Sequence, residues 1–178
     1  SEIGRYRLRY SGHFLNIDPA LLWSGGWDPA VVSREKLLVR QTGDALHAAY
    51  DPDGYYHLNN CHAIVLKGGG YLLKYILAIL NSRMMNRYYQ LVSLERGRAF
   101  AQVDMDMLGE LPIHPAPLPV QREIAALADR AIASLKEGDG RASPEAQAVL
   151  DEVDRAVCRL YDLTDEQIRL VEGAFTLL

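Results

Sequence analysis

The sequence predicts an α+β fold, in which a β-rich domain carries one long packed helix and is followed by a C-terminal helical segment. Three observations predict it. Residues 1–66 contain short alternating runs separated by turn residues. From residue 71, and again from residue 121, the apolar residues recur with a helical period. Prolines at 115, 117 and 119 form a stiff link between the two parts, so we place the domains at residues 1–118 and 119–178.

The first expected strand covers residues 5–10. Charged residues alternate there with apolar or aromatic ones, which is typical of a half-buried strand. Because successive side chains of a strand point to opposite faces, Arg5, Arg7 and Arg9 should lie on one face.

The next strands are expected at residues 36–40 and 46–50, joined by a turn at Gly43 and Asp44. A second strong turn at residues 51–54 (DPDG) leads into strands at 55–58 and 61–66.

A single helix is expected over residues 71–92, because leucine, isoleucine and methionine form a wide apolar face there. Arg83 and Arg87 are four residues apart and therefore share a face near its end. Residues 111–113 are expected to form a short closing strand.

The C-terminal part predicts further helices. Apolar stripes occupy residues 124–135 and 149–160, and Ser143 followed by Pro144 is a strong helix start. Thr164 and Gln167 form a capping box for a short last helix. The stripes are too short for a long coiled coil, so we expect these helices to brace the β-rich body.

Composition excludes several classes of protein. The chain has 178 residues, of which 49% are apolar and 24% charged, as expected of a globular protein with a sizeable core. No apolar run is long enough to cross a bilayer, and the arginine-rich start is no signal peptide. The two cysteines, Cys61 and Cys158, lie far apart and favour a reducing compartment such as the cytoplasm.

Charge is distributed unevenly. Residues 1–98 hold 12 lysines and arginines against 8 acidic residues, whereas residues 99–178 hold 7 against 15. The net charges are therefore +4 and −8, although the chain as a whole carries −4. A basic half joined to an acidic half is compatible with a nucleic-acid-binding domain on a solvated or protein-facing scaffold.

No catalytic or metal motif is complete. The turn at residues 51–54 has one proline and no catalytic Asn-Pro-Pro-aromatic form, and the glycines at 68–70 lack a phosphate-binding pattern. His57, Cys61 and His62 lack a fourth ligand for a tetrahedral metal site. We therefore expect a non-enzymatic chain that holds no metal.

The side chains of the first hundred residues suit duplex DNA. Arginine and lysine bind phosphates and guanine edges, whereas asparagine and glutamine read adenine edges. The phosphate candidates are Arg5, Arg7, Arg9, Lys36, Arg40, Arg83, Arg87, Arg96 and Arg98. The base-edge candidates are Gln41, Tyr55, His57, Asn59 and Asn60.

The order of several segments resembles a known family. These are residues 35–44 (EKLLVRQTGD), 48–51 (AAYD), 54–56 (GYY), 77–82 (LAILNS) and 100–112, followed by an amphipathic helix from residue 121. Together they resemble the TaqI-like C-terminal specificity domain, the target-recognition part of N6-adenine DNA methyltransferases and of type IIG and type I restriction–modification enzymes. The resemblance covers roughly residues 3–135.

The resemblance implies sequence recognition in double-stranded DNA by a bacterial or archaeal cytoplasmic protein. It implies that S-adenosylmethionine and catalysis belong to a methyltransferase domain or subunit that is the partner of this chain, which itself needs no cofactor. It also offers a second role for the C-terminal helices, as spacers that set the distance between half-sites in a homodimer. Gln41 departs from the family pattern, because a basic residue is common at that place.

Two other hypotheses remain. In one, the chain is an assembly module that docks a methyltransferase subunit through its acidic helical half. In the other, Asp104 and Asp106, with Glu110 nearby, form the metal-dependent site of a nuclease.

Overall fold

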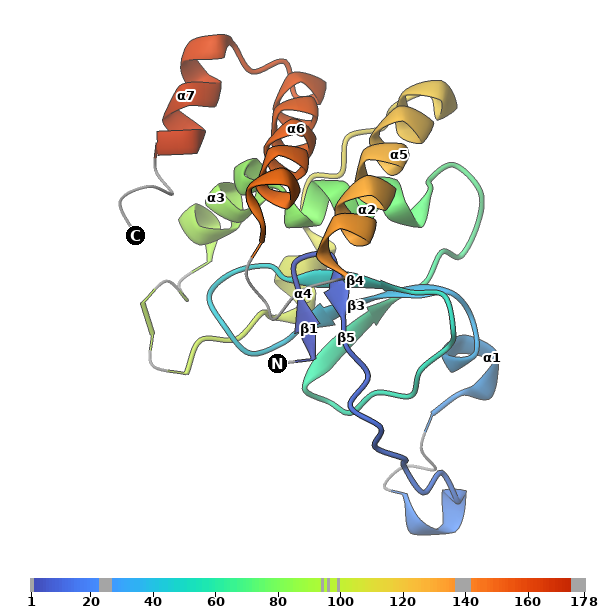
Figure 1. Cartoon of the computed structure of the whole chain (residues 1–178). Helices are drawn as coiled ribbons and strands as arrows, with labels where there is room; N and C mark the ends of the chain where they lie inside the picture. The colour runs from blue at the N-terminus through green and yellow to red at the C-terminus, as the bar shows by residue number, and fades with distance from the viewer. Residues whose placement is uncertain are drawn as a thin grey trace.

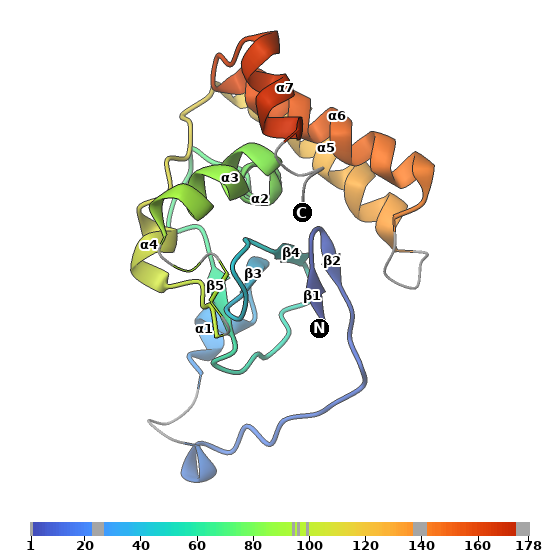
Figure 2. The same cartoon turned by 90° about the vertical axis from the view of Figure 1, so that its left-hand side faces the viewer.

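The computed structural model describes residues 2–22, 27–93, 95, 97–98, 100–136 and 142–173. It confirms the α+β fold. A small three-stranded sheet lies below a layer of helices, and the N-terminal hairpin stands against the sheet (Figures 1 and 2). Among the described residues, no helix is both long and apolar enough to cross a membrane.

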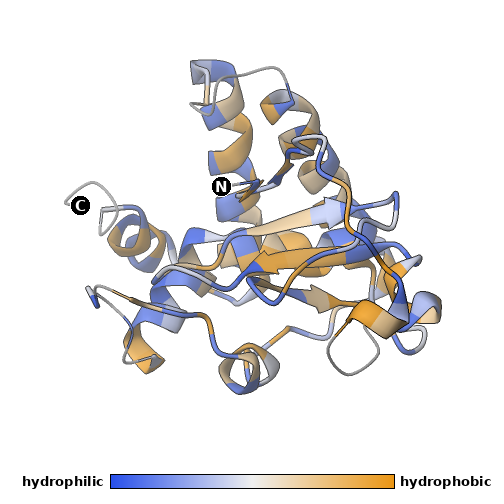
Figure 3. Cartoon of the chain, turned by 90° about the horizontal axis from the view of Figure 1, so that it is seen from below, coloured by the Kyte–Doolittle hydropathy of each residue, from blue (hydrophilic) through white to orange (hydrophobic). Residues whose placement is uncertain are grey.

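The three-stranded sheet is antiparallel in the order β4-β3-β5, with β3 (Lys36–Arg40) between β4 (Ala48–Asp51) and β5 (Cys61–Ile64). Leu37 and Val39 face the main core, while Leu38 packs on the opposite face. Strand β3 is therefore covered on both sides, which explains its unbroken apolar run. Figure 3 shows apolar residues along these strands and hydrophilic residues in many surrounding loops.

Two of the expected strands are absent. Residues 55–58 and 111–113 belong to no strand. The strand expected at residues 61–66 ends at Ile64, and the strand expected at residues 46–50 covers residues 48–51 instead.

The first segment is a tight hairpin, so the single strand predicted at residues 5–10 is wrong. Strands β1 (Ile3–Gly4) and β2 (Arg7–Leu8) pair around a turn at Arg5 and Tyr6. Tyr6 has a φ of 60° and is only 2% exposed, and its N–H donates to the carbonyl of Ala48 at 2.9 Å. The turn separates the arginines, which therefore do not share one strand face.

The expected long helix is broken into α2 (Leu73–Asn81) and α3 (Arg83–Val92). Ser82 is extended between them, and its hydroxyl accepts a hydrogen bond from the N–H of Met85 as an N-cap. The Asn81 carboxamide bonds both backbone groups of Ala48 at 2.9 Å, and so pairs the first residue on the outer edge of β4. The break therefore serves the junction between helices and sheet.

Helices α5 (Leu118–Leu135) and α6 (Pro144–Leu160) pack against the body, and α7 (Asp165–Gly173) follows them. Three short elements come earlier in the chain: α4 (Met105–Gly109) precedes α5, and η1 (Pro19–Leu21) and α1 (Pro29–Val32) precede the sheet. The predicted stripes of α5 and α6 are buried in the same core as Leu37 and Leu77. One continuous core thus crosses the boundary placed at residue 118.

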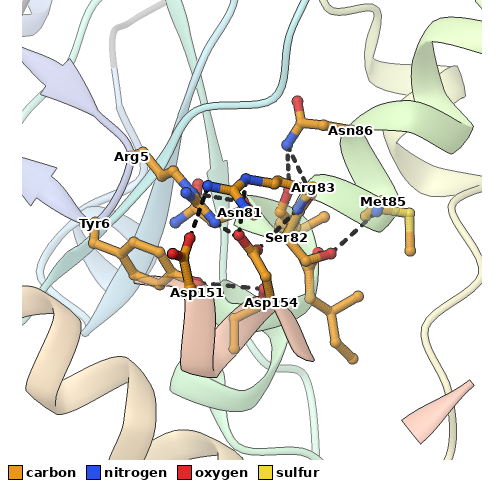
Figure 4. A network of polar contacts seen from close by, with 12 residues as sticks. Arg5, Tyr6, Asn81, Ser82, Arg83, Met85, Asn86, Asp151 and Asp154 are labelled. Carbon is orange, nitrogen blue, oxygen red and sulfur yellow. Dashed lines mark hydrogen bonds and ion pairs between the residues drawn. The ribbon is translucent and has the colours of Figure 1, made fainter. Parts of the chain in front are cut away.

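Asp154 of α6 ties the helical segment to the N-terminal half (Figure 4). Its Oδ1 accepts hydrogen bonds from Nη2 of Arg5 at 2.6 Å and from the N–H of Arg83 at 3.0 Å. Nη2 of Arg83 also bonds Asp151 at 2.8 Å, and Nε of Arg5 donates to the carbonyl of Asn81 at 2.8 Å. Hairpin, helix break and α6 therefore meet at one carboxylate.

Replacing Asp154 with alanine should lower the free energy of unfolding by about 2–4 kcal/mol, because the 3%-exposed carboxylate neutralises two arginines. Urea denaturation measures the change. The matched control is Glu152→Ala on the same helix, whose pair with Arg130 is half exposed and should contribute less than about 1 kcal/mol. Equal losses in both variants would contradict the role given to Asp154.

Candidate functional site

The loop of residues 52–60, which joins β4 to β5, carries four of the five base-edge candidates. Asn59 and Asn60 form an exposed turn directly before β5. Tyr55 and His57 are half-buried and precede them. We call this segment the 52–60 loop.

A buried ion pair holds the start of the 52–60 loop. The Asp51 carboxylate accepts hydrogen bonds from the backbone N–H groups of the next turn, at 3.0 Å from Asp53, 3.0 Å from Gly54 and 2.8 Å from Tyr55. Nζ of Lys36 lies 2.6 Å from the same carboxylate, and both side chains are 0% exposed. The loop is therefore folded around a neutralised carboxylate at its base.

Lys36 is consequently not a phosphate contact, and that prediction is wrong. The opposed position of Lys36 and Asp51 in the β3–β4 register directs both side chains to the same covered face. The ammonium group also donates to the carbonyl of Val32 at 2.7 Å. It acts as the countercharge that makes burial of Asp51 possible.

Gly54 is required by the geometry of the 52–60 loop. Its φ is 75°, in the left-handed region that favours glycine. A Cβ at this position would lie 3.0–3.1 Å from backbone atoms of Ser33, which cannot move as a side-chain tip could. The turn is therefore fixed against the segment after α1.

Gln41 is brought to the far end of the 52–60 loop. Its N–H donates to the carbonyl of Asn60 at 3.0 Å, and its carbonyl accepts from Val103 at 2.6 Å. Gln41, Asn59 and Asn60 thus belong to adjoining segments at one end of the sheet. Three carboxamide side chains, each offering a donor and an acceptor, come from this end.

Arg40 precedes Gln41 and is half-buried. Its Nη2 lies so close to Gly43 that a Cβ there would be 2.9 Å away. Within the described part of the chain, its buried Nε has no hydrogen-bond partner. Burial, and then the nearby charges of Arg40 and Arg5, lower the pKa of His47 to about 4. A neutral His47 therefore lies beside the Arg40 charge at neutral pH.

The remaining arginines are dispersed. Arg5 and Arg83 are held by Asp154, so their prediction as phosphate contacts is corrected to a structural role. Arg98 is exposed and paired with Glu95. Arg7, Arg9 and Arg87 make no ion pair with any residue that the structure describes. Their side chains are half-buried at Arg7 and Arg87 and exposed at Arg9. Arg96 lies outside the described residues.

The residues considered for other chemistry have local roles. Asp104 caps α4, because its carboxylate accepts from the N–H groups of Asp106 and Met107. His62 bonds the carbonyl of Val103 through Nε2 at 2.8 Å, and burial raises the pKa of the Cys61 thiol to about 11. Within the described ranges, no three histidine, cysteine or acidic side chains gather into a metal site.

Two aromatic residues that the sequence analysis passed over also contact the 52–60 loop. They are Tyr10 and Trp27, both from the long connection between β2 and β3. Aromatic residues among glycines and turn residues, in a segment with little periodicity, are a signal that could have singled them out. That signal does not indicate which segment they contact.

The stability of the chain should fall in acid through His47. The folded-state pKa of about 4 lies below the ordinary 6.5, so between these values the unfolded chain binds a proton that the folded chain excludes. This contribution is present above pH 6.5 and is lost as the pH falls toward 4, by about 1–3 kcal/mol. Denaturation of His47→Gln should therefore show a shallower pH dependence than the parent chain. His13→Gln, at an exposed position, is the control and should keep the parental slope.

Comparison with known proteins assigns the chain to a family. Among curated proteins, none matches it. The family described as the TaqI-like C-terminal specificity domain matches residues 1–113, which include the hairpin, the sheet, the 52–60 loop, α2 and α3. This match covers more than half of the 178 residues. The chain therefore belongs to the family of TaqI-like C-terminal specificity domains.

Proposed function

We propose that this chain selects the DNA target of an N6-adenine methyltransferase or restriction–modification enzyme of type IIG or type I. In this proposal it binds double-stranded DNA in the bacterial or archaeal cytoplasm and performs no catalysis. The methyltransferase domain or subunit supplies S-adenosylmethionine and the chemistry. Membership of the specificity-domain family supports the DNA-recognition role.

The observation that carries the proposal is the set of carboxamides at the end of the sheet. Asn59 and Asn60 are exposed, and the hydrogen bond from Gln41 to Asn60 joins their segments. Asparagine and glutamine form paired hydrogen bonds with N6 and N7 of adenine in the major groove. The site is therefore suited to reading A·T base pairs.

The Asp51 carboxylate makes this surface well suited to selective binding. A loop that is ordered before binding loses less conformational entropy when it meets its ligand. The three backbone bonds to Asp51 order the start of the 52–60 loop in the free chain. Discrimination between base sequences then depends on fixed donors and acceptors.

Phosphate contacts are assigned in the proposal to Arg40, which adjoins the carboxamides, and to Arg7, Arg9 and Arg87, which make no ion pair within the described structure. Arg98, which is exposed although paired with Glu95, and Arg96, which lies outside the described residues, stay candidates. Such contacts position the protein on the duplex and give affinity that does not depend on base sequence. The dispersal of these arginines implies that Arg40 contributes most to binding at the carboxamide end.

The proposal is tested by selection from a pool of random duplexes with the full chain. An enriched motif that contains A·T pairs is the expected result. Recovery of unenriched sequence at both low and moderate salt would contradict sequence recognition. Binding of a methyltransferase chain without any DNA selectivity would instead support the assembly-module hypothesis.

Arg40→Ala should weaken binding to the selected duplex severalfold and reduce the slope of log affinity against log salt by about one. The reason is that one phosphate contact, with its released counterion, is lost. Fluorescence anisotropy over a salt series measures both quantities. Arg159→Ala, at an exposed position on α6, is the matched control and should change neither. An unchanged slope in Arg40→Ala would remove Arg40 from the interface.

Asn60→Ala should relax base preference at one position of the selected motif, with a loss of discrimination of about 1–3 kcal/mol. Its backbone carbonyl still accepts from Gln41, so the loop path should persist. Repeating the selection with the variant shows the effect directly. Asn16→Ala, in the exposed connection after β2, serves as a control and should select the parental motif. If Asn60→Ala also did so at full stringency, the side chain would not read a base.

A further inference from the structure

We propose that Trp27 and Tyr10 are positioning residues, which fix the outer half of the 52–60 loop for base reading. This inference rests on the proposed function and deepens it. Neither side chain is expected to touch DNA in this role. Both would act through the loop residues that they hold.

Trp27 makes two contacts with the 52–60 loop. Its indole Nε1 donates to the carbonyl of His57 at 2.6 Å. Its ring meets the ring of Tyr56 edge to face, with centroids 5.4 Å apart and an interplanar angle of 88°. Trp27 is half-buried, and the backbone of the loop supplies the acceptor for its indole N–H.

Tyr10 holds the neighbouring residue by stacking. The rings of Tyr10 and Tyr55 have centroids 5.2 Å apart and planes inclined by 27°. Tyr55 and Tyr56 are consecutive, and their aromatic partners come from two different points of the same long connection. The loop is therefore held by ring contacts at two successive residues, Tyr55 and Tyr56.

The contacts of Trp27 act beyond the residues that the Asp51 carboxylate reaches, whereas Tyr10 holds the side chain of Tyr55, whose backbone Asp51 bonds. Asp51 bonds the backbone as far as Tyr55, and Gln41 bonds Asn60. Between them, the described hydrogen bonds to residues 56–59 from outside the loop come from Cys61 of β5, which bonds the Leu58 carbonyl, and from Trp27, which is distant in the sequence. Trp27 thus fixes the backbone immediately before the carboxamide turn.

The connection that carries Tyr10 and Trp27 lacks the cations of a DNA-binding segment. Residues 10–33 contain no lysine or arginine. The part between Tyr10 and Leu22 extends away from the body (Figures 1 and 2) and its large apolar side chains are exposed, with Leu21 at 69%. Phosphate binding depends on cations, so this segment is better suited to holding a loop than to binding the backbone of DNA.

The test compares the full-length chain with Trp27→Phe, which keeps an aromatic ring beside Tyr56 but removes the N–H donor. The readout is the specificity ratio, the affinity for the selected duplex divided by that for a scrambled duplex of equal length and salt. A merely structural role would lower both affinities together. We expect the ratio to fall about five- to tenfold, with affinity for the scrambled duplex and the melting temperature nearly unchanged.

Tyr10 supplies an independent variant. Tyr10→Phe preserves the stacking and should keep the parental ratio, whereas Tyr10→Leu removes it and should lower the ratio. Leu21→Ala lies on the same connection, is exposed, and is the matched control. Hydrogen exchange of the peptide that spans residues 52–60 should rise in Trp27→Phe and Tyr10→Leu alone.

The outcomes separate this inference from the proposed function. If the parent chain selects no sequence, the proposed function fails and the inference falls with it. If the parent selects a motif and Trp27→Phe and Tyr10→Leu retain its full specificity ratio, the inference alone is overturned. A lower ratio in both, with rescue in Tyr10→Phe, supports it.

Discussion

The buried carboxylate of Asp51 is the constraint on which the candidate site depends. A carboxylate without water needs both hydrogen-bond donors and a countercharge. Three backbone N–H groups and the ammonium group of Lys36 supply them, and in doing so they bend the chain into the turn that starts the 52–60 loop. The path of the loop toward Asn59 and Asn60 follows from that turn.

Asp154 has a comparable place between the two halves of the chain. It gathers Arg5 and Arg83, which the sequence offers as cations of the basic half, and directs them inward. The basic excess of residues 1–98 therefore overstates the charge available on the surface. For binding a polyanion, the number of cations that remain on the surface therefore matters less than the position of Arg40 beside Gln41.

Elements with strong local signals were predictable. The apolar run of β3, the turn residues after it and the stripes of α5 and α6 all determined structure locally, and the order of motifs indicated the family. The break at Ser82 was hidden because the apolar pattern continues through it, although a serine three residues before Met85 is a capping signal. The alternation at residues 5–10 led to a wrong prediction, because a hairpin turn centred on Tyr6 also alternates charged residues with apolar or aromatic ones.

The carboxamide candidates could be named from the sequence, but the contacts that support their segments could not. Carboxamides in a loop before a strand can be recognised from their chemistry alone. The role of Lys36 needed the β3–β4 register, which places it opposite Asp51. Arg5 meets Asp154 across 149 residues, and Trp27 meets His57 across 30. No local pattern encodes such distant contacts.

Hydrogen exchange of the full chain, with and without its selected duplex, shows whether the 52–60 loop and the adjoining Gln41 segment form the face that meets DNA. The duplex should slow exchange in the peptides containing residues 41–44 and 56–60, and should leave the outer faces of α6 and α7 unchanged. Protection confined to α5, α6 and α7, with the 52–60 loop unaffected, would contradict this position of the DNA-binding face.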